Sequence, residues 1–332
     1  MGKYVLGMDG GGTKTHLSVF DIDGNLIDLV TWGKTNHESF RGGYDELKIE
    51  LNKLFTYVLD RNRIILDDLE ICVFGLAGVD TRKQHNIISN ILKELGIKDF
   101  VLCNDAYLGI KAGCKCGYGI CATNGTSSSV GGIDSYGNRI QIGGCGDLSG
   151  GEVGGGGYLA GRAFSAVYNS LFKGEPETCI TDLLFSLLNI NSKFDFVEAI
   201  NEVLDEGKYR YDYFNKFVFE AANRNDAVAL GILDKMGVEY AKCINAVIEN
   251  LKYDSNHCIE IVLAGSLFVK GENPRAIETL RKFVSEKNLK KDISIRVLEN
   301  LPVMGAVIWA LEEYGIREAF NKVQNNFIMN QI

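Results

Sequence analysis

One internal repeat limits the possible folds of this chain more than any other feature of its sequence. Shifting the sequence by 113 residues places residues 12–27 on residues 125–140, with six identities in sixteen positions, where chance gives about one. A shorter echo follows later, because residues 101–104 resemble residues 297–300. The chain is therefore predicted to contain two copies of one structural unit. The identical pairs are Gly12/Gly125, Thr13/Thr126, Asp21/Asp134, Gly24/Gly137, Asn25/Asn138 and Ile27/Ile140.

The first copy has the pattern of three strands followed by alternating helices and strands. This βββαβαβα order is typical of an α/β unit with a mixed sheet, antiparallel at one edge and joined by parallel crossovers. We expect two such five-stranded units with a cleft between them. Apolar runs predict strands at 4–8, 17–20, 26–31, 71–76 and 100–103, and helical spacing predicts helices at 44–60, 82–95 and 106–113.

The predicted domain boundaries follow from the repeat. We expect a first domain at residues 1–115 and a second at 116–302, with a helical insertion at about 158–250. A final helix at about 303–330 is assigned to the first domain. Of the 38 glycines, 18 lie in residues 109–161, which favours a cleft at the junction between the copies.

Composition excludes several classes of protein. The net charge of −8 argues against a dedicated nucleic-acid surface, which needs clustered lysine and arginine. No apolar run approaches the roughly 18 residues of a membrane span. Most of the nine cysteines stand in apolar contexts, which favours reduced, buried thiols. We expect a cytoplasmic protein with a small-molecule substrate, which forms a homodimer.

A glycine-rich turn, Asp9–Thr15, follows the first predicted strand. Its glycines allow a tight turn that presents backbone N–H groups to an anion, and the Thr13 and Thr15 hydroxyls add donors. Alone, this turn could equally be a plain hairpin. Its copy at residues 124–129 provides a second glycine–threonine turn, so we predict two phosphate-binding loops facing each other across a cleft. Asp9 could hold Mg²⁺ directly or through water.

Asp105 directly follows the predicted strand at 100–103 and precedes a helix. A carboxylate at the carboxyl end of a strand faces the crevice of an α/β sheet and could accept a proton from an attacking hydroxyl. The alternative is a helix N-cap, a position that Asp favours.

Three further segments have both a functional and a structural interpretation. Asn36-His37 could bind a sugar or be part of an ordinary loop. The glycine-rich residues 143–157 could form a substrate loop or a surface linker, and Gly265-Ser266 could lie under an adenosine or form a simple strand-to-helix turn.

Six short motifs follow one another along the chain: 9–15, 75–78, 104–106, 125–129, 143–146 and 264–266. In this order they resemble the BadF/BadG/BcrA/BcrD ATPase family, and within it the N-acetylglucosamine kinases. The resemblance covers nearly the whole chain and implies the duplicated ribonuclease-H-like fold of actin and hexokinase. It implies a kinase that uses ATP and Mg²⁺ to phosphorylate a hydroxyl of an amino sugar of the N-acetylglucosamine, N-acetylmuramic acid or glucosamine type.

The same resemblance implies a role for each matching residue. Asp105 would be the catalytic base and a sugar ligand, and Asp9 would hold Mg²⁺. The nucleotide would contact Gly11, Gly12, Thr13, Lys14, Thr126, Ala222, Gly265 and Ser266. The sugar would contact Asn36, His37, Asp105, Ser128, Ser129, Gly144, Cys145, Gly146 and Glu152.

Two positions depart from the family pattern. Cys145 stands where a tryptophan is expected, and Gly151 stands where a sugar-binding aspartate is expected. Glu152 or Asp147 could replace that aspartate, so the sequence leaves the exact sugar open.

Two other functions fit the same motifs. The chain could be an ATPase activator that passes electrons through an iron–sulfur cluster, with Cys114 and Cys116 as ligands, or a sugar or nucleotide sensor without activity. The run from Cys114 to Cys121 also resembles the zinc motif of another group of sugar kinases, although buried thiols explain it as well.

Overall fold

The computed structural model describes residues 2–126, 128–144, 153–254, 257–316 and 318–329. Five residues discussed above therefore lie outside the described residues: Cys145, Gly146, Asp147, Gly151 and Glu152.

The first lobe is built on a five-stranded mixed sheet in the order β3-β2-β1-β4-β5. The first three strands are antiparallel, and β4 and β5 are added in parallel to β1. The βββαβαβα order agrees with the pattern read from the sequence. Its elements are β1 (Tyr4–Gly10), β2 (Thr15–Asp21), β3 (Leu26–Trp32), η1 (His37–Ser39), α1 (Gly43–Asn62), η2 (Leu66–Asp68), β4 (Leu69–Leu76), α2 (Arg82–Glu94), β5 (Phe100–Cys103) and α3 (Ala106–Gly113).

The second lobe repeats this topology. Its sheet has the order β8-β7-β6-β9-β10. In both sheets the first strand of the copy is central, with the second and third strands on one side of it and the fourth and fifth on the other. Its strands are β6 (Gly119–Asn124), β7 (Ser128–Ile133), β8 (Arg139–Gly143), β9 (Ile259–Ala264) and β10 (Ile293–Val297).

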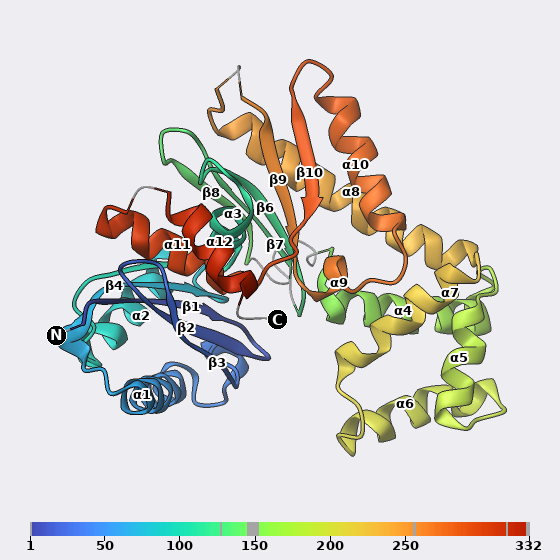
Figure 1. The fold of residues 1–332 in the computed structure, drawn as a ribbon. Coiled ribbons are helices and arrows are strands. Elements are labelled where there is room, and N and C mark those ends of the chain that lie inside the picture. Colours follow the sequence, from blue (N-terminus) through green and yellow to red (C-terminus); the bar gives the residue numbers. More distant parts are fainter. Residues whose placement is uncertain (1, 127, 145–152, 255–256, 317, 330–332) are drawn as a thin grey trace.

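Helices of the second copy cover its sheet and extend beyond it. Helix α8 packs on β6, β7 and β8, and α10 packs against α8. In the first lobe, α1 contacts the equivalent sheet at β3. Helices α4–α7 form the part of the second lobe at the right of Figure 1, between β8 and α8 in sequence. The helical elements are α4 (Gly155–Lys173), α5 (Cys179–Leu188), η4 (Lys193–Asp195), α6 (Phe196–Asp205), η5 (Tyr211–Asn215), α7 (Lys216–Asn223), α8 (Ala227–Asn250), α9 (Ser266–Val269), α10 (Arg275–Lys287), α11 (Val303–Tyr314) and α12 (Ala319–Met329).

Two helices between the sheets join the lobes reciprocally. Helix α3 follows the last strand of the first sheet but packs mainly on β6, β7 and β9 of the second, whereas α11 follows the last strand of the second sheet and packs on β1, β2 and β4 of the first. The two helices also pack on each other between the sheets (Figure 1). One apolar core runs through this layer, including Leu108, Val262 and Trp309. Burial of this core ties the two lobes together.

The expected single helix at the C-terminal end is interrupted, and this corrects the prediction. Helix α11 ends at Tyr314, because Gly315 adopts a left-handed conformation with φ of 100° and caps the helix with bonds to Glu312 and Leu311. A second helix, α12, begins at Ala319. The apolar spacing of the segment did not reveal this glycine stop.

None of the helices in the described part of the chain is both long enough and apolar enough to cross a membrane.

Candidate active site

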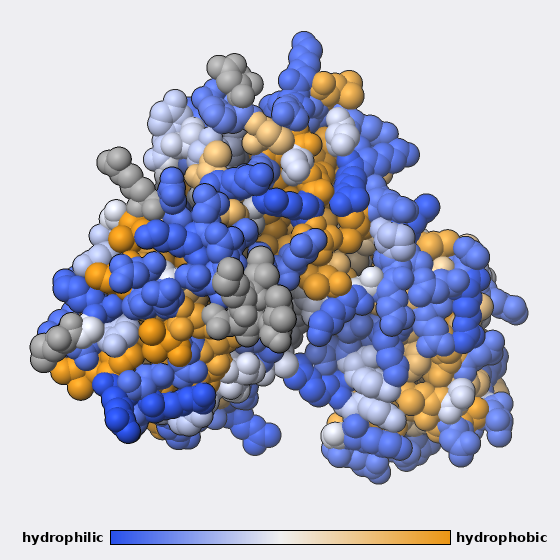
Figure 2. Space-filling model, in the orientation of Figure 1, coloured by the Kyte–Doolittle hydropathy of each residue, from blue (hydrophilic) through white to orange (hydrophobic). Residues whose placement is uncertain are grey.

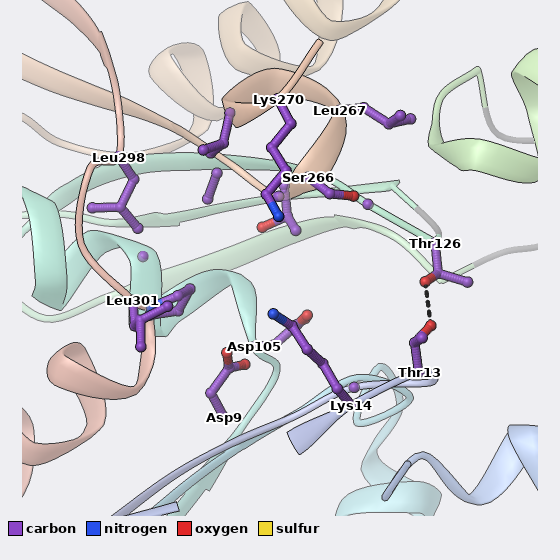
Figure 3. A pocket seen from close by; sticks show the side chains of 18 of the residues that line it. Asp9, Thr13, Lys14, Asp105, Thr126, Ser266, Leu267, Lys270, Leu298 and Leu301 are labelled. Atoms are coloured by element: carbon purple, nitrogen blue, oxygen red, sulfur yellow. Dashed lines mark hydrogen bonds between the residues drawn. The ribbon is translucent and has the colours of Figure 1, made fainter. Parts of the chain in front are cut away.

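Two hairpin loops meet at the mouth of the cleft. The first, Gly11–Lys14, joins β1 to β2, and the second begins at Gly125 and joins β6 to β7. The hydroxyl oxygens of Thr13 and Thr126 lie 2.9 Å apart in a hydrogen bond across the cleft (Figure 3). The two loops therefore face each other, as the repeat predicted, and their repeated threonines are in direct contact.

Backbone hydrogen bonds fix the shape of the first loop. The N–H of Gly11 donates to the Lys14 carbonyl at 3.0 Å, closing the turn, and the Thr35 N–H donates to the Gly11 carbonyl at 3.0 Å. The Ala77 N–H donates to the Gly10 carbonyl at 2.8 Å, which ties the loop to the end of β4. These hydrogen bonds therefore hold the first loop against the segments on both sides of it.

The second loop is anchored from two sides. The N–H groups of Gly155 and Gly156, at the start of α4, donate to the Asn124 side chain and the Gly125 carbonyl, each at 2.8 Å. Gly265 packs against Asn124 from the other side with φ of 90°, and an added Cβ would lie 2.4 Å from the Asn124 carbonyl oxygen. Glycine is therefore required at 265, both for the backbone conformation and for this close approach.

Between the loops lies a cavity of about 450 Å³. Both loops line it, together with Asp9, Asp105 and Gly265-Ser266. One side of it is apolar, with Leu298 and Leu301. Figure 3 shows these two leucines at the left of the view, with Leu267 apart from them at the upper right, and Figure 2 shows the surface hollowed between the first lobe and the helical part of the second. A cavity with an apolar side and a polar mouth suits a nucleotide, whose base is apolar on both faces and whose phosphates are charged.

Two lysines point into this cavity from opposite lobes. Lys14 extends from the first loop and Lys270 from the end of α9, and Figure 3 shows their side chains directed toward each other across the space. Within the part of the chain that the structure describes, neither ammonium group forms a salt bridge or a side-chain hydrogen bond. Such cations beside a glycine loop favour binding of an anion such as a phosphate chain. Lys270 has no local signal in the sequence, because it stands in an ordinary helix end.

Asp105 lies between β5 and α3 on the wall of the cavity. Its side chain forms no capping hydrogen bond. The side chain of Asn104 takes that role instead, with Oδ1 accepting from the Ala106 N–H at 3.0 Å. Burial, together with the nearby charges of Asp9 and Asp80, raises the pKa of Asp105 to about 7. Asp105 does stand at the N-cap position of α3, as the alternative interpretation expected, and its raised pKa also suits a general base near neutral pH.

Asp9 is the penultimate residue of β1, beside the first loop. Its Oδ2 lies 3.9 Å from Nδ1 of His16 on the paired strand β2. The described residues contain no group of three or more His, Cys, Asp or Glu side chains arranged to hold a metal ion. A single carboxylate beside a phosphate site nevertheless fits Mg²⁺, which commonly takes one or two carboxylates and completes its shell with water and substrate phosphates.

Asn36 and His37 lie in the first lobe, at η1, and are not part of the cavity lining. Asn36 Oδ1 accepts from the Glu38 N–H at 3.0 Å, and His37 stacks on Tyr44 with ring centroids 4.2 Å apart. Burial lowers the pKa of His37, and its Nδ1 is buried without a hydrogen-bond partner among the described residues. Both side chains approach Gly78. An orphaned buried nitrogen beside a polar loop is a place where a ligand hydroxyl could bind.

A polar bridge that the sequence did not predict crosses the cleft next to Asp105. Asp80, just after β4, accepts hydrogen bonds from Asn104 at 3.0 Å and from Gln141 of β8. On the neighbouring strand, Ser129 pairs with Gly143 in the sheet, and Ser128 begins β7. Asp80 stands two residues after the 75–78 motif, which was the one local signal available.

One predicted nucleotide contact is placed away from the cavity. Ala222 lies in α7, is 2% exposed and belongs to the apolar core of the second lobe. It is not among the residues that line the cavity, so the structure does not bring it together with Thr13, Thr126 and Ser266.

Four of the eight cysteines among the described residues are buried, three are partly exposed and one is exposed. Burial raises the pKa of the Cys103 and Cys121 thiols to about 12 and also raises that of Cys114. Cys116 is exposed on the surface. Protonated, buried thiols are poor metal ligands and nucleophiles.

Known proteins share both the sequence pattern and the fold. An N-acetylmuramic acid/N-acetylglucosamine kinase of Clostridium acetobutylicum is 28% identical over 94% of this chain and 99% of its own length. An N-acetyl-D-glucosamine kinase of Dictyostelium discoideum is 24% identical over 93% of this chain and 98% of its own. These relatives match the chain almost from end to end.

Solved structures agree on the fold. A candidate N-acetylglucosamine kinase of Chromobacterium violaceum superposes with a TM-score of 0.66 at 18% identity, covering 92% of this chain and 97% of its own. A glucokinase of the ROK family from Streptomyces griseus gives a TM-score of 0.55 at 17% identity, covering 93% and 99%. The predicted α/β fold with duplicated five-stranded sheets is thereby confirmed. The sequence model of one family matches residues 6–310, and the chain therefore belongs to the BadF/BadG/BcrA/BcrD ATPase family.

Proposed function

We propose that this protein is an ATP-dependent kinase that phosphorylates a hydroxyl group of an amino sugar of the N-acetylglucosamine or N-acetylmuramic acid type. Two full-length relatives are kinases of these sugars. The observation that carries the proposal is the position of Asp105, whose carboxyl group has a pKa raised to about 7 on the wall of a cavity between two phosphate-type loops. Transfer of the γ-phosphate to a hydroxyl group requires a base of this kind close to the phosphate.

In the proposed reaction, Asp105 acts as the general base. Its carboxylate accepts the proton of the sugar hydroxyl as that oxygen attacks the γ-phosphorus of ATP. The bond between the γ-phosphorus and the bridging oxygen breaks, and ADP leaves with that oxygen. Because the reaction is mostly one of positioning and charge stabilisation, the lobes contribute by holding sugar and ATP in line and by excluding water.

The phosphate chain would be held by donors from both lobes. The backbone N–H group of Gly12 and the hydroxyls of Thr13 and Thr126 lie at the cavity mouth, and Lys14 adds a positive charge. Gly11 lines the cavity beside them, with its own N–H group bonded to the Lys14 carbonyl. We add Lys270 to this set, because its ammonium group lies across the cavity from Lys14. Asp9 would hold Mg²⁺, which supplies charge neutralisation on the phosphates when bound.

The adenosine would occupy the apolar side of the cavity. Gly265-Ser266 forms one wall, and Leu298 and Leu301 offer apolar surface for the base. On the sugar side we keep Asn36, His37, Ser128, Ser129 and Gly144 as proposed contacts; Cys145, Gly146 and Glu152 stay predictions. The expectations of a homodimer and of a cytoplasmic location also stay predictions.

A substrate screen tests this function. ADP formation is measured with ATP and Mg²⁺ in the presence of N-acetylglucosamine, N-acetylmuramic acid, glucosamine, N-acetylmannosamine or glucose, and each product is identified by mass spectrometry and NMR. We expect a sugar phosphate with at least one N-acetylated amino sugar and much less with glucose. Absence of phosphorylated product with every amino sugar, while ATP binds, would remove the proposal.

A further inference from the structure

The Asp80 side chain joins the two lobes by hydrogen bonds. It follows β4 of the first lobe, and a single carboxylate oxygen, Oδ1, accepts two hydrogen bonds. One comes from Nδ2 of Asn104 in the first lobe at 3.0 Å, and the other comes from Nε2 of Gln141 on β8 of the second lobe. The bridge is thus a polar contact between the lobes in addition to the one between Thr13 and Thr126 at the loop tips.

Asn104 connects this bridge to Asp105. Its exposed fraction is 3%, so its amide group lies in the interior. The amide nitrogen is held by Asp80, and the amide oxygen accepts from the Ala106 N–H at the start of α3. Both ends of the Asn104 amide group are therefore fixed. Asp105 lies in the sequence between Asn104 and Ala106, which the second of these hydrogen bonds joins. A shift of Asp80 would move Asn104 and with it the backbone that carries the proposed base.

The end of β8 approaches Asp80 very closely. Gly144 has φ of 74°, and an added Cβ would lie 2.5 Å from the Asp80 carboxyl carbon. A side chain at 144 would therefore collide with Asp80 as well as strain the backbone. The contact is made at the point where the proposed sugar-binding segment of the second lobe leaves the sheet.

We propose that Asp80 is a positioning residue, which couples closure of the second lobe through Gln141 to the placement of Asn104 and Asp105. This inference rests on the proposed kinase function. With the lobes together, the hydrogen bond from Gln141 fixes Asp80, and Asp80 fixes Asn104. With the lobes apart, Gln141 withdraws and Asp80 loses that amide donor. The base is then fully oriented only when the cleft is closed, as expected for an enzyme that limits ATP hydrolysis in the open state.

Charge gives the bridge a second effect that a purely structural contact would lack. Asp80 and Asp9 both lie close enough to Asp105 to raise the pKa of its carboxyl group. Removing the negative charge of Asp80 while keeping its shape should therefore lower the pKa of Asp105. The other charged or titratable groups that line the cavity with Asp105 are Lys14, His16, Asp212, Lys270 and Glu299.

Three variants test the coupling. In Asp80→Asn, the amide oxygen can still accept from Asn104 and Gln141, so we expect only a modest loss of rate and an acidic limb of the kcat/KM profile that moves to lower pH. In Gln141→Glu, two carboxylates face each other, and kcat/KM for the sugar should fall about 100-fold. In the double variant, the new amide at position 80 can donate to the new carboxylate at position 141 while its oxygen accepts from Asn104, and kcat/KM should return to within about tenfold of wild type.

Asp67→Asn is the matched control, because Asp67 is an exposed carboxylate paired with Lys98 at 2.7 Å and does not line the cavity. It should change neither the rate nor the pH profile. If Asp80→Asn does not fold, as judged by circular dichroism, Gln141→Leu replaces it; that variant leaves Asp80 in place and should lower kcat/KM about tenfold.

The outcome separates this inference from the proposed function. If the wild-type protein phosphorylates no sugar, the function itself is wrong. If the wild type is active, the coupling is wrong when the Gln141 variants keep kcat/KM within about twofold of wild type, or when the double variant is no more active than Gln141→Glu. A pH profile of Asp80→Asn identical to that of the wild type would overturn the electrostatic part.

Discussion

The two copies of the fold use the same strand-to-helix junction for different purposes. In the first copy, β5 is followed by Asn104 and Asp105 and then by α3. In the second, β10 is followed in the corresponding places by Asn300 and Leu301 before α11. Both junctions line the same cavity, and at the corresponding positions the first has the carboxyl group of Asp105 and the second has the apolar side chain of Leu301. Duplication thus provided two equivalent positions, of which one is suited to proton transfer and the other to contact with a base.

The loops at the cleft mouth show the opposite behaviour, because there the copies stayed alike. Thr13 and Thr126 are a repeated pair in the sequence and hydrogen-bond to each other in the structure. A phosphate chain bound between the lobes, as proposed, would need donors from both sides, which explains why both copies keep the same chemistry. The comparison predicts that changes at the two junctions have unlike effects and changes at the two loops have similar ones.

The largest expected effect comes from the unlike junctions. Asp105→Asn should lower kcat for sugar phosphorylation by about 10²–10⁴-fold, since it removes a general base, while the dissociation constant for ATP changes little. Leu301→Asn, its counterpart in the second copy, should instead raise KM for ATP and leave kcat nearly unchanged. Steady-state kinetics and calorimetry of ATP binding check both. Equal losses of kcat in Asp105→Asn and Leu301→Asn would contradict the proposed difference between the two junctions.

The pH dependence of kcat/KM tests the role of Asp105 at the first junction. Asp105 must be ionised to accept a proton, and its pKa is raised to about 7. Below this pH, kcat/KM for the sugar, which reports the free enzyme, should fall about tenfold for each pH unit. A profile that stays flat down to about pH 5 would show that a different group, or none, takes the proton. The Leu301→Asn variant should keep the wild-type profile.

The loops should give smaller and matching effects. Thr13→Val and Thr126→Val each remove one hydroxyl donor and should raise KM for ATP about tenfold, with little change in KM for the sugar. Thr→Ser at either position keeps the hydroxyl and serves as the control. A large effect from one valine variant and none from the other would mean that the loops are not functionally equivalent.

The smallest expected effect concerns the repeated turns. Asp21 accepts bonds from Asp23 and Asn25 in the first copy, and Asp134 accepts the equivalent bonds from Tyr136 and Asn138. Asp134 is more deeply buried, at 2% exposure, and also accepts from the Lys252 N–H at 3.2 Å. Asp134→Ala should therefore destabilise the protein by about 2–3 kcal/mol and Asp21→Ala by about 1 kcal/mol in urea unfolding. Equal losses would contradict this ranking.

The repeat was visible in the sequence because its identities have separate physical causes. Asp21/Asp134 and Asn25/Asn138 form the same turn, and Gly24/Gly137 adopt φ of 89° and 80° in it, a region that favours glycine. Local constraints of this kind leave a pattern that one sequence can reveal. The strand order and the facing loops followed from it.

The rest of the site depends on contacts between distant segments. Asp80 and Gln141 are 61 residues apart and carry no local signature of their hydrogen bond. Lys270 becomes a cavity residue only because α9 is placed beside the second loop, and Ala222 was assigned to the nucleotide by resemblance although packing puts it in a core. Such positions are determined by how the lobes meet, and neither periodicity nor motif spacing contains that information.

The proposed function requires that the cleft transfers phosphate to a sugar rather than merely hydrolysing ATP. The most direct measurement is the ratio of sugar phosphate to ADP formed, together with the rate of ADP formation with and without an N-acetylated amino sugar. We expect one sugar phosphate for each ADP and strong stimulation of ADP formation by the sugar. ADP formed at the same rate without sugar, and no phosphorylated sugar, would contradict it.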